Sequence, residues 1–574
     1  MYQAGWGKQD IGITPRGYAM MGYGMWHHRA RQQQSALYAR AFFLADDKGS
    51  ALIFCCLDLG YVTHAMRSAV CAELREKMGP AFREEAFVLT CTHTHSGPGG
   101  CSHDALYNVV TPGFVPDHVD HIVAACVAAI LQAHSSAAPT GLSLLQGDFD
   151  AAVPVAWNRS LRAYNRNPDV MPRSDTETHL ALSRVMQVLG FRRNGELKSL
   201  LSLFGVHATC VSSQQKKHDG DNKGYAAAHA EQMLQAAGSP DAVAIFAQAT
   251  AGDVSPHYHG PGEVARRQKI KGEAEYAYAR RNGEYQSERA LSLLQSGQEE
   301  KISGGIDAVF SYVDFTALKA DARYANGNEE AFTSDPCHGV AFFTGTPVDG
   351  PGMPKALGFV VRKLARALQK RRLDNPGKYS VADQAYYRRL YAAQSPKAIL
   401  LEAGRKQILG QSLDKLMLPD FADPLVKEMK RQARLGAINK SALVPTVLPL
   451  QIIRIGQIAM VCCPGEFTTT AGQRVIDTVR EELHALGIQQ VLICTYCNDY
   501  MGYVTTREEY QEQAYEGGHT IFGQWTLAAF QTRFADLARQ LRKPEAERTH
   551  DRRTQPRPAP AEELALRSNL PISG

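Results

Sequence analysis

Residues 86–100 read AFVLTCTHTHSGPGG, an apolar run that ends in two histidines and a glycine-rich turn. The first ten residues form a short, apolar and partly β-branched run, which predicts a buried strand. Side chains of a strand alternate between its faces, so His93 and His95 are expected to project to the same face. Two imidazoles near a strand end could begin a metal site, since neutral imidazole is a favoured zinc ligand. An isolated His-x-His pair is weak evidence, and surface or hydrogen-bonded histidines are the alternative.

Further apolar runs of the same kind flank this stretch on both sides. They occupy residues 39–46, 50–60, 199–210, 242–253, 450–467 and 490–500. Helical patterns lie between several of them, as in VDHIVAACVAAILQAH (119–134) and AGQRVIDTVREELHALG (471–487). This alternation favours an α/β fold over an all-helical one. We predict one large domain over residues 1–542, with mixed β-sheets flanked by helices.

The composition is typical of a soluble globular protein. Of the 574 residues, 44% are hydrophobic and 21% charged, and the formal net charge is +5. No aromatic and basic repeat suggests a nucleic-acid partner. The sequence has neither the pattern of a signal peptide nor an apolar run of about 18 residues. We therefore expect a cytoplasmic protein.

The twelve cysteines are scattered along the chain. Two adjacent pairs, Cys55-Cys56 and Cys462-Cys463, lie in apolar runs, where neighbouring side chains point to opposite faces. Cys494 and Cys497 form one C-x-x-C pair without a second pair, so a zinc ribbon is not expected. Buried free thiols in a reducing compartment are the prediction.

Two segments in the C-terminal half stand apart by composition. PKALGFVVRKLARALQKRRLDNPG (354–377) predicts a basic amphipathic helix. Such a helix can lie on an anionic membrane surface, cover an apolar cleft, or simply pack on the body with its charges in solvent. Residues 543–574 begin with a charged, proline-rich stretch and are expected to form a disordered tail.

Polar residues follow three other predicted strands. His207 lies where one apolar run ends, Glu466 follows a Pro-Gly at the end of another, and Tyr503 lies just past a third. Strand ends are where α/β proteins build their sites, so these residues and His93 predict a common site. Ser255 lies in AGDVSP, which is not the G-x-S-x-G pattern of a serine hydrolase.

These blocks together resemble the neutral, non-lysosomal ceramidases, from about Gly12 to Phe534. The resemblance rests on segments that follow one another in the family's order: MMGYG, YARAFFLAD, THTHSGPGG, NRSLRAYNRNP, DNKGYAAAHAE, AGDVSP, GTPVDGPG, RIGQIAMVCCPGEFTT and YVTTREEYQEQAYEGGHT. So many blocks in the same order do not match by chance.

The resemblance implies a role for each matching residue. His93, His207, Glu466 and Tyr503 would hold one zinc ion. His95 would lie beside the metal and transfer protons. Arg159 and Tyr515 match residues that face the scissile amide, and Ser255 matches the family's active-site serine.

The implied reaction is hydrolysis of the amide of ceramide to a fatty acid and a sphingoid base by metal-activated water. His95 would act as general base and then as acid to the leaving amine. Arg159 or Tyr515 would stabilise the tetrahedral oxyanion. Ser255 is expected to orient water or substrate rather than to form an acyl-enzyme.

Some departures from the family leave alternatives open. The family's secreted members carry a C-terminal immunoglobulin-like domain that this chain does not show, and an inserted, partly helical region is expected at about residues 355–440. The substrate could be another N-acylated amine or amino acid. A zinc-bearing binding protein without turnover and a metal-free serine hydrolase using Ser255 are further alternatives. We expect a lipid-like N-acyl amide as the binding partner, no nucleic acid, and a possible peripheral membrane contact through the basic helix; the sequence does not predict the oligomeric state.

Overall fold

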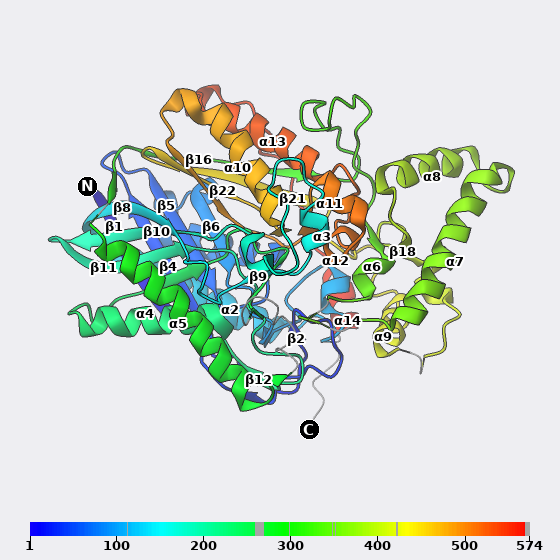
Figure 1. Cartoon of the computed structure of the whole chain (residues 1–574), viewed down its shortest axis with the longest axis horizontal. Helices are drawn as coiled ribbons and strands as arrows, with labels where there is room; N and C mark the ends of the chain where they lie inside the picture. The colour runs from blue at the N-terminus through cyan, green and yellow to red at the C-terminus, as the bar shows by residue number, and fades with distance from the viewer. Residues whose placement is uncertain are drawn as a thin grey trace.

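Two β-sheets pack face to face at the centre of the molecule, and helices cover their outer faces (Figure 1). The computed structural model describes residues 1–111, 113–258, 269–297, 299–346, 348–350, 352–420 and 423–568. Within these ranges the layers follow the order helix, sheet, sheet, helix. The predicted α/β fold with mixed sheets is therefore confirmed.

The larger sheet has nine strands in the described part of the chain. Eight form the order β13-β11-β10-β8-β1-β4-β5-β6, and β15 also pairs with β8. Most neighbours are antiparallel, but β5–β6 and β11–β13 are parallel. The strands are β1 (Tyr2–Asp10), β4 (Tyr38–Ala45), β5 (Ala51–Leu57), β6 (Phe87–Cys91), β8 (Ala138–Asp148), β10 (Val185–Arg193), β11 (Glu196–Leu203), β13 (Ala244–Ala247) and β15 (Glu300–Ile302).

The smaller sheet has the order β16-β21-β22-β24 among the described residues. Its strands are β16 (Ile306–Asp314), β21 (Val447–Ile455), β22 (Ile458–Cys462) and β24 (Gln490–Cys494). The pair β22–β24 is parallel and the other pairs are antiparallel.

Strand β5 shows how the sequence fills both faces of the larger sheet. All seven of its residues are buried, and they alternate between two cores. Cys56 packs in the core between the two sheets, whereas Cys55 packs under the helices on the outer face. Cys462 and Cys463 divide in the same way. The predicted opposite orientation of adjacent cysteines is confirmed, and all twelve thiols are free and buried.

Helices cover each sheet on its outer side. The larger sheet is covered by α1 (His64–Met78) and α2 (Pro116–Ser135) over one half, and by α4 (Asp221–Ala236) and α5 (Glu273–Gln295) over the other. The smaller sheet is covered by α10 (Thr469–Leu483) and α13 (Thr526–Leu541), at the top of Figure 1.

A glycine in β1 allows one of these helices to lie directly on the strand. A Cβ atom at Gly7 would lie 2.1 Å from the Ala129 carbonyl oxygen of α2, well inside contact distance. A larger residue at this position would therefore have to push the helix away from the sheet.

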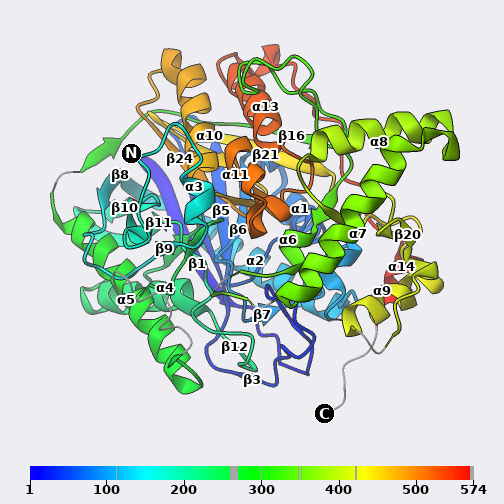
Figure 2. The ribbon, with the colours of Figure 1, turned by 45° about the vertical axis from the view of Figure 1, so that its right-hand side comes forward.

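A lobe beside the two sheets contains the region where an insertion is expected. It projects to the right in Figure 1 and comes forward in Figure 2. Its helices are α6 (Val340–Phe343), α7 (Lys355–Asp374), α8 (Val381–Gln394) and α9 (Pro424–Arg434). Its own sheet joins β17 (Cys337–Gly339), β18 (Ile399–Glu402), β19 (Gln407–Ile408) and β20 (Gln411–Ser412). Helix α7 coincides with the predicted basic amphipathic helix.

No helix among the described residues is both long and apolar enough to cross a lipid bilayer.

The segment after Lys543 differs from the disordered tail expected from its composition. Residues 543–568 lie on the body of the protein and include α14 (Ala561–Arg567). Arg548 forms an ion pair with Asp307, and Ser568 donates a hydrogen bond to the Phe114 carbonyl (2.7 Å). Arg567 is fully buried and donates to the carbonyl oxygens of Ala437 (3.0 Å) and His103 (2.6 Å). A few specific anchors hold this segment, and average composition does not reveal them; residues 569–574 lie outside the described part.

We expect Arg567→Ala to lower the free energy of unfolding by about 2–3 kcal/mol, since it leaves one buried and one partly buried carbonyl group without their charged donor. Denaturant unfolding followed by circular dichroism measures the change. The exposed Arg557→Ala in the same segment is the control and should have no effect. Equal stability of the two variants would mean that the segment adds nothing to the fold.

Candidate metal and catalytic site

The two histidines of the opening stretch lie beyond the strand in which they were expected. Strand β6 ends at Cys91, and His93 has a left-handed backbone with φ 63°. The alternation of a strand therefore does not explain why the two rings share a side. Instead, Thr94 forms a parallel β-bridge with Ala208, and the His95 amide donates to the Ala208 carbonyl (3.2 Å). This bridge brings the loop of His93 and His95 against the loop of His207.

Backbone carbonyls fix the tautomers of two histidines. The Nδ1 atom of His93 lies 2.5 Å from the Gly60 carbonyl oxygen, and that of His207 lies 3.0 Å from the Val254 carbonyl oxygen. Because a carbonyl only accepts, each Nδ1 must carry the proton. Each Nε2 then offers a lone pair, which is the arrangement found in histidines that bind metal ions.

Glu466 and Tyr503 reach the same point from neighbouring strands. Strand β23 (Glu466–Phe467) pairs in parallel with β25 (Tyr503–Val504), in a register that sets these two residues side by side. The Glu466 carboxylate lies 2.9 Å from Nε2 of His207 and 3.4 Å from Nε2 of His93. The Tyr503 hydroxyl lies 3.2 Å from Nε2 of His207. The structure thus brings together the four residues predicted to bind zinc.

This donor set fits a zinc ion. Two imidazole nitrogens, a carboxylate and a phenol are nitrogen and oxygen ligands in a number that zinc accepts. The exposed fractions of His93, His207, Glu466 and Tyr503 are 1%, 0%, 1% and 3%. The potential ligand atoms of His93, His95 and His207 lie within 4.8 Å of one another, so the geometry also places His95 beside the metal position.

Burial and neighbouring groups set the charges at the site. Burial lowers the pKa of His93 to about 4, so the imidazole is neutral at neutral pH. Burial alone would raise the pKa of Glu466, but the neighbouring His93 and His207 and the hydrogen bond from Tyr500 hold it well below its usual value. The site therefore combines the carboxylate charge of Glu466 with a neutral imidazole at His93, and a cation there would be favourable.

Two tyrosines that the sequence analysis missed hold the Glu466 carboxylate. Tyr500 donates to Oε1 (2.5 Å) and Tyr496 to Oε2 (3.3 Å). The Tyr496 ring also stacks on His93, with 4.2 Å between centroids. Both tyrosines lie in CTYCNDYMGY, which the sequence analysis interpreted as a buried strand with a thiol pair, so no motif pointed to them.

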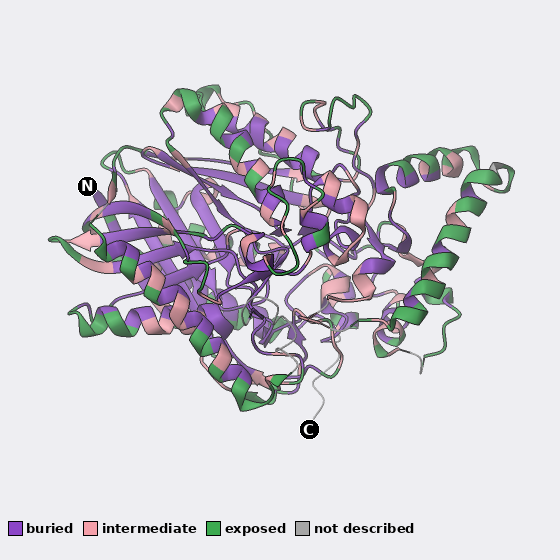
Figure 3. Ribbon diagram, viewed as in Figure 1, coloured by how far each residue is buried: buried purple, intermediate pink, exposed green. Residues whose placement is uncertain are grey.

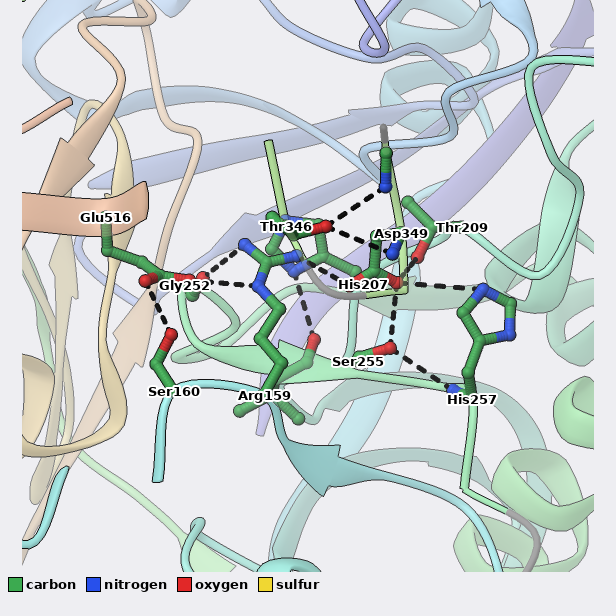
Figure 4. Close-up of polar contacts among 12 residues, drawn as sticks. Arg159, Ser160, His207, Thr209, Gly252, Ser255, His257, Thr346, Asp349 and Glu516 are labelled. Atoms are coloured by element: carbon green, nitrogen blue, oxygen red, sulfur yellow. Dashed lines mark hydrogen bonds and ion pairs between the residues drawn. The ribbon is translucent and has the colours of Figure 1, made fainter. Parts of the chain in front are cut away.

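Arg159 is buried behind Tyr503 and is held by four partners, three of them drawn in Figure 4. Its Nη2 donates to the Tyr503 hydroxyl (3.0 Å) and to the Gly252 carbonyl (2.9 Å). Nη1 donates to Asp349 (3.0 Å) and Nε donates to Glu516 (2.9 Å). Arg159 follows β9 (Trp157–Asn158), which pairs with β14 (Val254–Ser255), so the sheet geometry also places Ser255 near it.

Ser255 is hydrogen-bonded to the carboxylate of Asp349, which was not among the predicted site residues. Its hydroxyl donates to Oδ1 of Asp349 (2.8 Å), as does the hydroxyl of Thr209 (3.0 Å) (Figure 4). Burial would raise the pKa of Asp349, but Arg159 and His257 hold it below its usual value, so it is ionised. His257, two residues beyond Ser255 in the chain, is also buried, with its Nε2 3.6 Å from Asp349.

Asp349 and Glu516 are the main residues missing from the predicted site. Both lie in segments that carried the resemblance, GTPVDGPG and YEGGHT. A carboxylate in each block was a signal, but only the fold shows that both reach the same arginine.

Tyr515 and His95 each lie against one of the proposed ligands. Tyr515 begins α12 (Tyr515–Gly518), is half-buried, and has its ring 5.4 Å from that of Tyr503. His95 has its Nε2 3.0 Å from Nε2 of His93 and is packed edge-on against Tyr23. Gly22, at φ 128°, lies against the His95 ring, where a Cβ atom would come within 2.3 Å.

The chain matches the family model described as neutral/alkaline non-lysosomal ceramidase, N-terminal, over residues 2–416 and 428–532. It is 32% identical over 547 residues to the neutral ceramidase of Pseudomonas aeruginosa, covering 94% of this chain and 72% of that protein. It is 32% identical over 555 residues to the neutral ceramidase of Mycobacterium tuberculosis, covering 94% and 77%. A solved structure entitled "Ceramidase complexed with C2" is similar, with a TM-score of 0.76, 31% identity and coverage of 94% and 75%.

We expect the purified chain to hold about one zinc ion, and His207→Ala to lose it, because His207 offers a lone pair inside the donor cluster. Metal analysis by inductively coupled plasma mass spectrometry measures the content. His121→Ala, on an exposed helix face, is the control and should keep the metal. Full zinc content in His207→Ala would rule this donor set out.

Proposed function

Because the chain belongs to the neutral/alkaline non-lysosomal ceramidase family, we propose that it is a zinc-dependent hydrolase that cleaves the N-acyl amide of ceramide. The products would be a fatty acid and a sphingoid base. The observation that carries the proposal is the convergence of His93, His207, Glu466 and Tyr503, with Arg159 bonded to Tyr503 behind them.

Zinc at this position would supply Lewis acidity, which activates water and polarises the amide carbonyl. The chain's own residues prepare the site for that charge. The Glu466 carboxylate is ionised and held by two tyrosine hydroxyls, so it needs little rearrangement. The carbonyl oxygens of Gly60 and Val254 fix the orientation of the His93 and His207 rings.

His95 is placed to move the proton. Its Nε2 faces the same space as Nε2 of His93, and burial lowers its pKa well below the usual value. The ring is therefore neutral and can accept a proton from the attacking water. It would return that proton to the amide nitrogen as the carbon–nitrogen bond breaks, so that the sphingoid base leaves as an amine.

Tyr515 is better placed than Arg159 to donate to the oxyanion. Arg159 directs its Nε, Nη1 and Nη2 to Glu516, Asp349, Gly252 and Tyr503, so it positions those groups. Within the described residues the Tyr515 hydroxyl makes no hydrogen bond, and burial raises its pKa, so it stays protonated. A free donor beside the ligands can stabilise charge that develops on the carbonyl oxygen.

Ser255 supports this arrangement through Asp349. Its proton is directed at a carboxylate that is also paired with Arg159. The pairing lowers the pKa of Asp349 and makes it a weak base, which does not favour an alkoxide at Ser255. We therefore assign Ser255 to positioning and not to an acyl-enzyme.

Fatty-acid release tests the substrate. The zinc-loaded chain is incubated with a mixed pool of N-acyl amides that includes ceramides, and free fatty acids are measured by mass spectrometry. We expect release from ceramide, and at least a roughly 10³-fold loss in His207→Ala because the metal is lost. Release from other amides only would reject ceramide as the substrate, and no release from any amide would reject the hydrolase.

Chelation and Ser255→Ala separate the zinc mechanism from a serine mechanism. We expect a chelator to abolish turnover, and Ser255→Ala to lower kcat by roughly 10-fold, since only the support of Asp349 is lost. Steady-state kinetics and a search for an acyl adduct by intact-protein mass spectrometry measure both. Activity that survives chelation but disappears in Ser255→Ala would establish the serine mechanism instead.

A further inference from the structure

Helix α7 touches the rest of the protein along one narrow stripe. Its buried residues are Gly358, Ala365 and Arg372, which are spaced by seven and so lie on one side of the helix. Arg372 anchors this side through an ion pair with Glu402 (2.6 Å). Most of the other residues of α7 are exposed, as the green colouring of the helix in Figure 3 shows.

The exposed surface of α7 includes an apolar row. Leu357, Val360 and Leu364 are 50%, 52% and 52% exposed. They are three and four residues apart, so they lie on one side of the helix, next to the buried stripe. Isolated exposed leucines are ordinary, but three in a row on one helix side form a surface that water solvates poorly.

Basic residues occupy much of the remaining surface of the helix. They are Lys355, Arg362, Lys363, Arg366, Lys370 and Arg371. Among the residues that the structure describes, none of these six forms an ion pair, so their charge is not neutralised by the protein. Phe359, 59% exposed, lies among them, and the Lys363 ammonium group is 4.5 Å from its ring centroid.

The first turn of α7 is close in sequence to the catalytic groups. The segment between α6 and α7 carries Asp349, which binds Arg159 and Ser255. This segment is closed by a hydrogen bond from the Met353 amide to the Phe343 carbonyl (2.6 Å). Phe342 of α6 has its ring 5.2 Å from that of Tyr515. The apolar row therefore begins on the same lobe edge that packs against the site.

We propose that α7 docks this protein on an anionic membrane surface. Leu357, Val360 and Leu364 enter the interface, and the basic side chains contact anionic headgroups. The chemistry is that of an interfacial amphipathic helix, in which apolar contact and attraction to anionic lipid act together. The inference rests on the proposed function, because ceramide is a lipid that must be taken from a bilayer.

Vesicle sedimentation tests the docking without any turnover. The full chain is mixed with vesicles of phosphatidylcholine alone, or of phosphatidylcholine with phosphatidylserine, and the bound fraction is measured. We expect binding to the anionic vesicles that weakens with added salt. The variant Lys363→Glu/Arg366→Glu/Lys370→Glu should lower the partition coefficient by roughly 100-fold, and Leu357→Ser/Val360→Ser/Leu364→Ser should lower it by roughly 10-fold or more.

A matched variant controls for net charge. Arg31→Glu/Lys216→Glu/Lys301→Glu changes the net charge equally at exposed positions away from α7, and should bind nearly as well as the unaltered chain. Hydrolysis of a soluble short-chain amide should be the same in all these variants, which separates a failure of docking from a failure of the proposed function.

Equal losses in the control and in the α7 variants, or no binding to anionic vesicles, would overturn the proposal. Analytical ultracentrifugation tests whether a second copy of the chain binds the apolar row of α7 instead. A dimer that dissociates in the apolar variant, with no vesicle binding, would assign the apolar row to a second copy of the chain.

Discussion

The buried guanidinium of Arg159 is the interaction on which the site depends. It joins Tyr503, Asp349, Glu516 and the Gly252 carbonyl, which come from four separate segments. A buried charge is tolerated only when it is paired and hydrogen-bonded, so each partner is needed by the others. Loss of one partner from a buried pair costs about 3–5 kcal/mol in proteins, far more than a surface pair. The arginine thus fixes the Tyr503 hydroxyl, the Asp349 carboxylate and the start of α12 at the same time.

The two sheets supply the frame, but the site lies in the loops beyond them. His93 follows the end of β6 in a left-handed conformation, and His207 follows the end of β11. A bridge between Thr94 and Ala208 aligns these loops. The short parallel pair β23–β25 then brings in Glu466 beside its partner tyrosine. Loops of this kind would move independently without such links, so these short pairings make the donor atoms converge.

Much of the fold followed from local sequence. Apolar runs separated by helical patterns predicted the layers, and alternation along β5 predicted that Cys55 and Cys56 would face different cores. The same alternation failed for His93, because the strand stops before it and a positive φ is not visible in an apolar pattern. Composition failed for residues 543–568, since a few specific contacts, among them those of the buried Arg567, hold them on the body.

The site was predictable where a residue type and its neighbours form a motif, and not where distance in sequence hides the partner. The proposed zinc ligands were inferred from the resemblance, and the structure brings these residues together. Asp349 lies 190 residues from Arg159, so no local rule pairs them. Asp349 lies between α6 and α7, in the lobe beside the two sheets. The Asp349 carboxylate orients Arg159 and Ser255. Its segment continues directly into α7, an exposed helix with basic residues and an apolar row. The carboxylate at the site and the exposed helix thus belong to one continuous stretch of backbone.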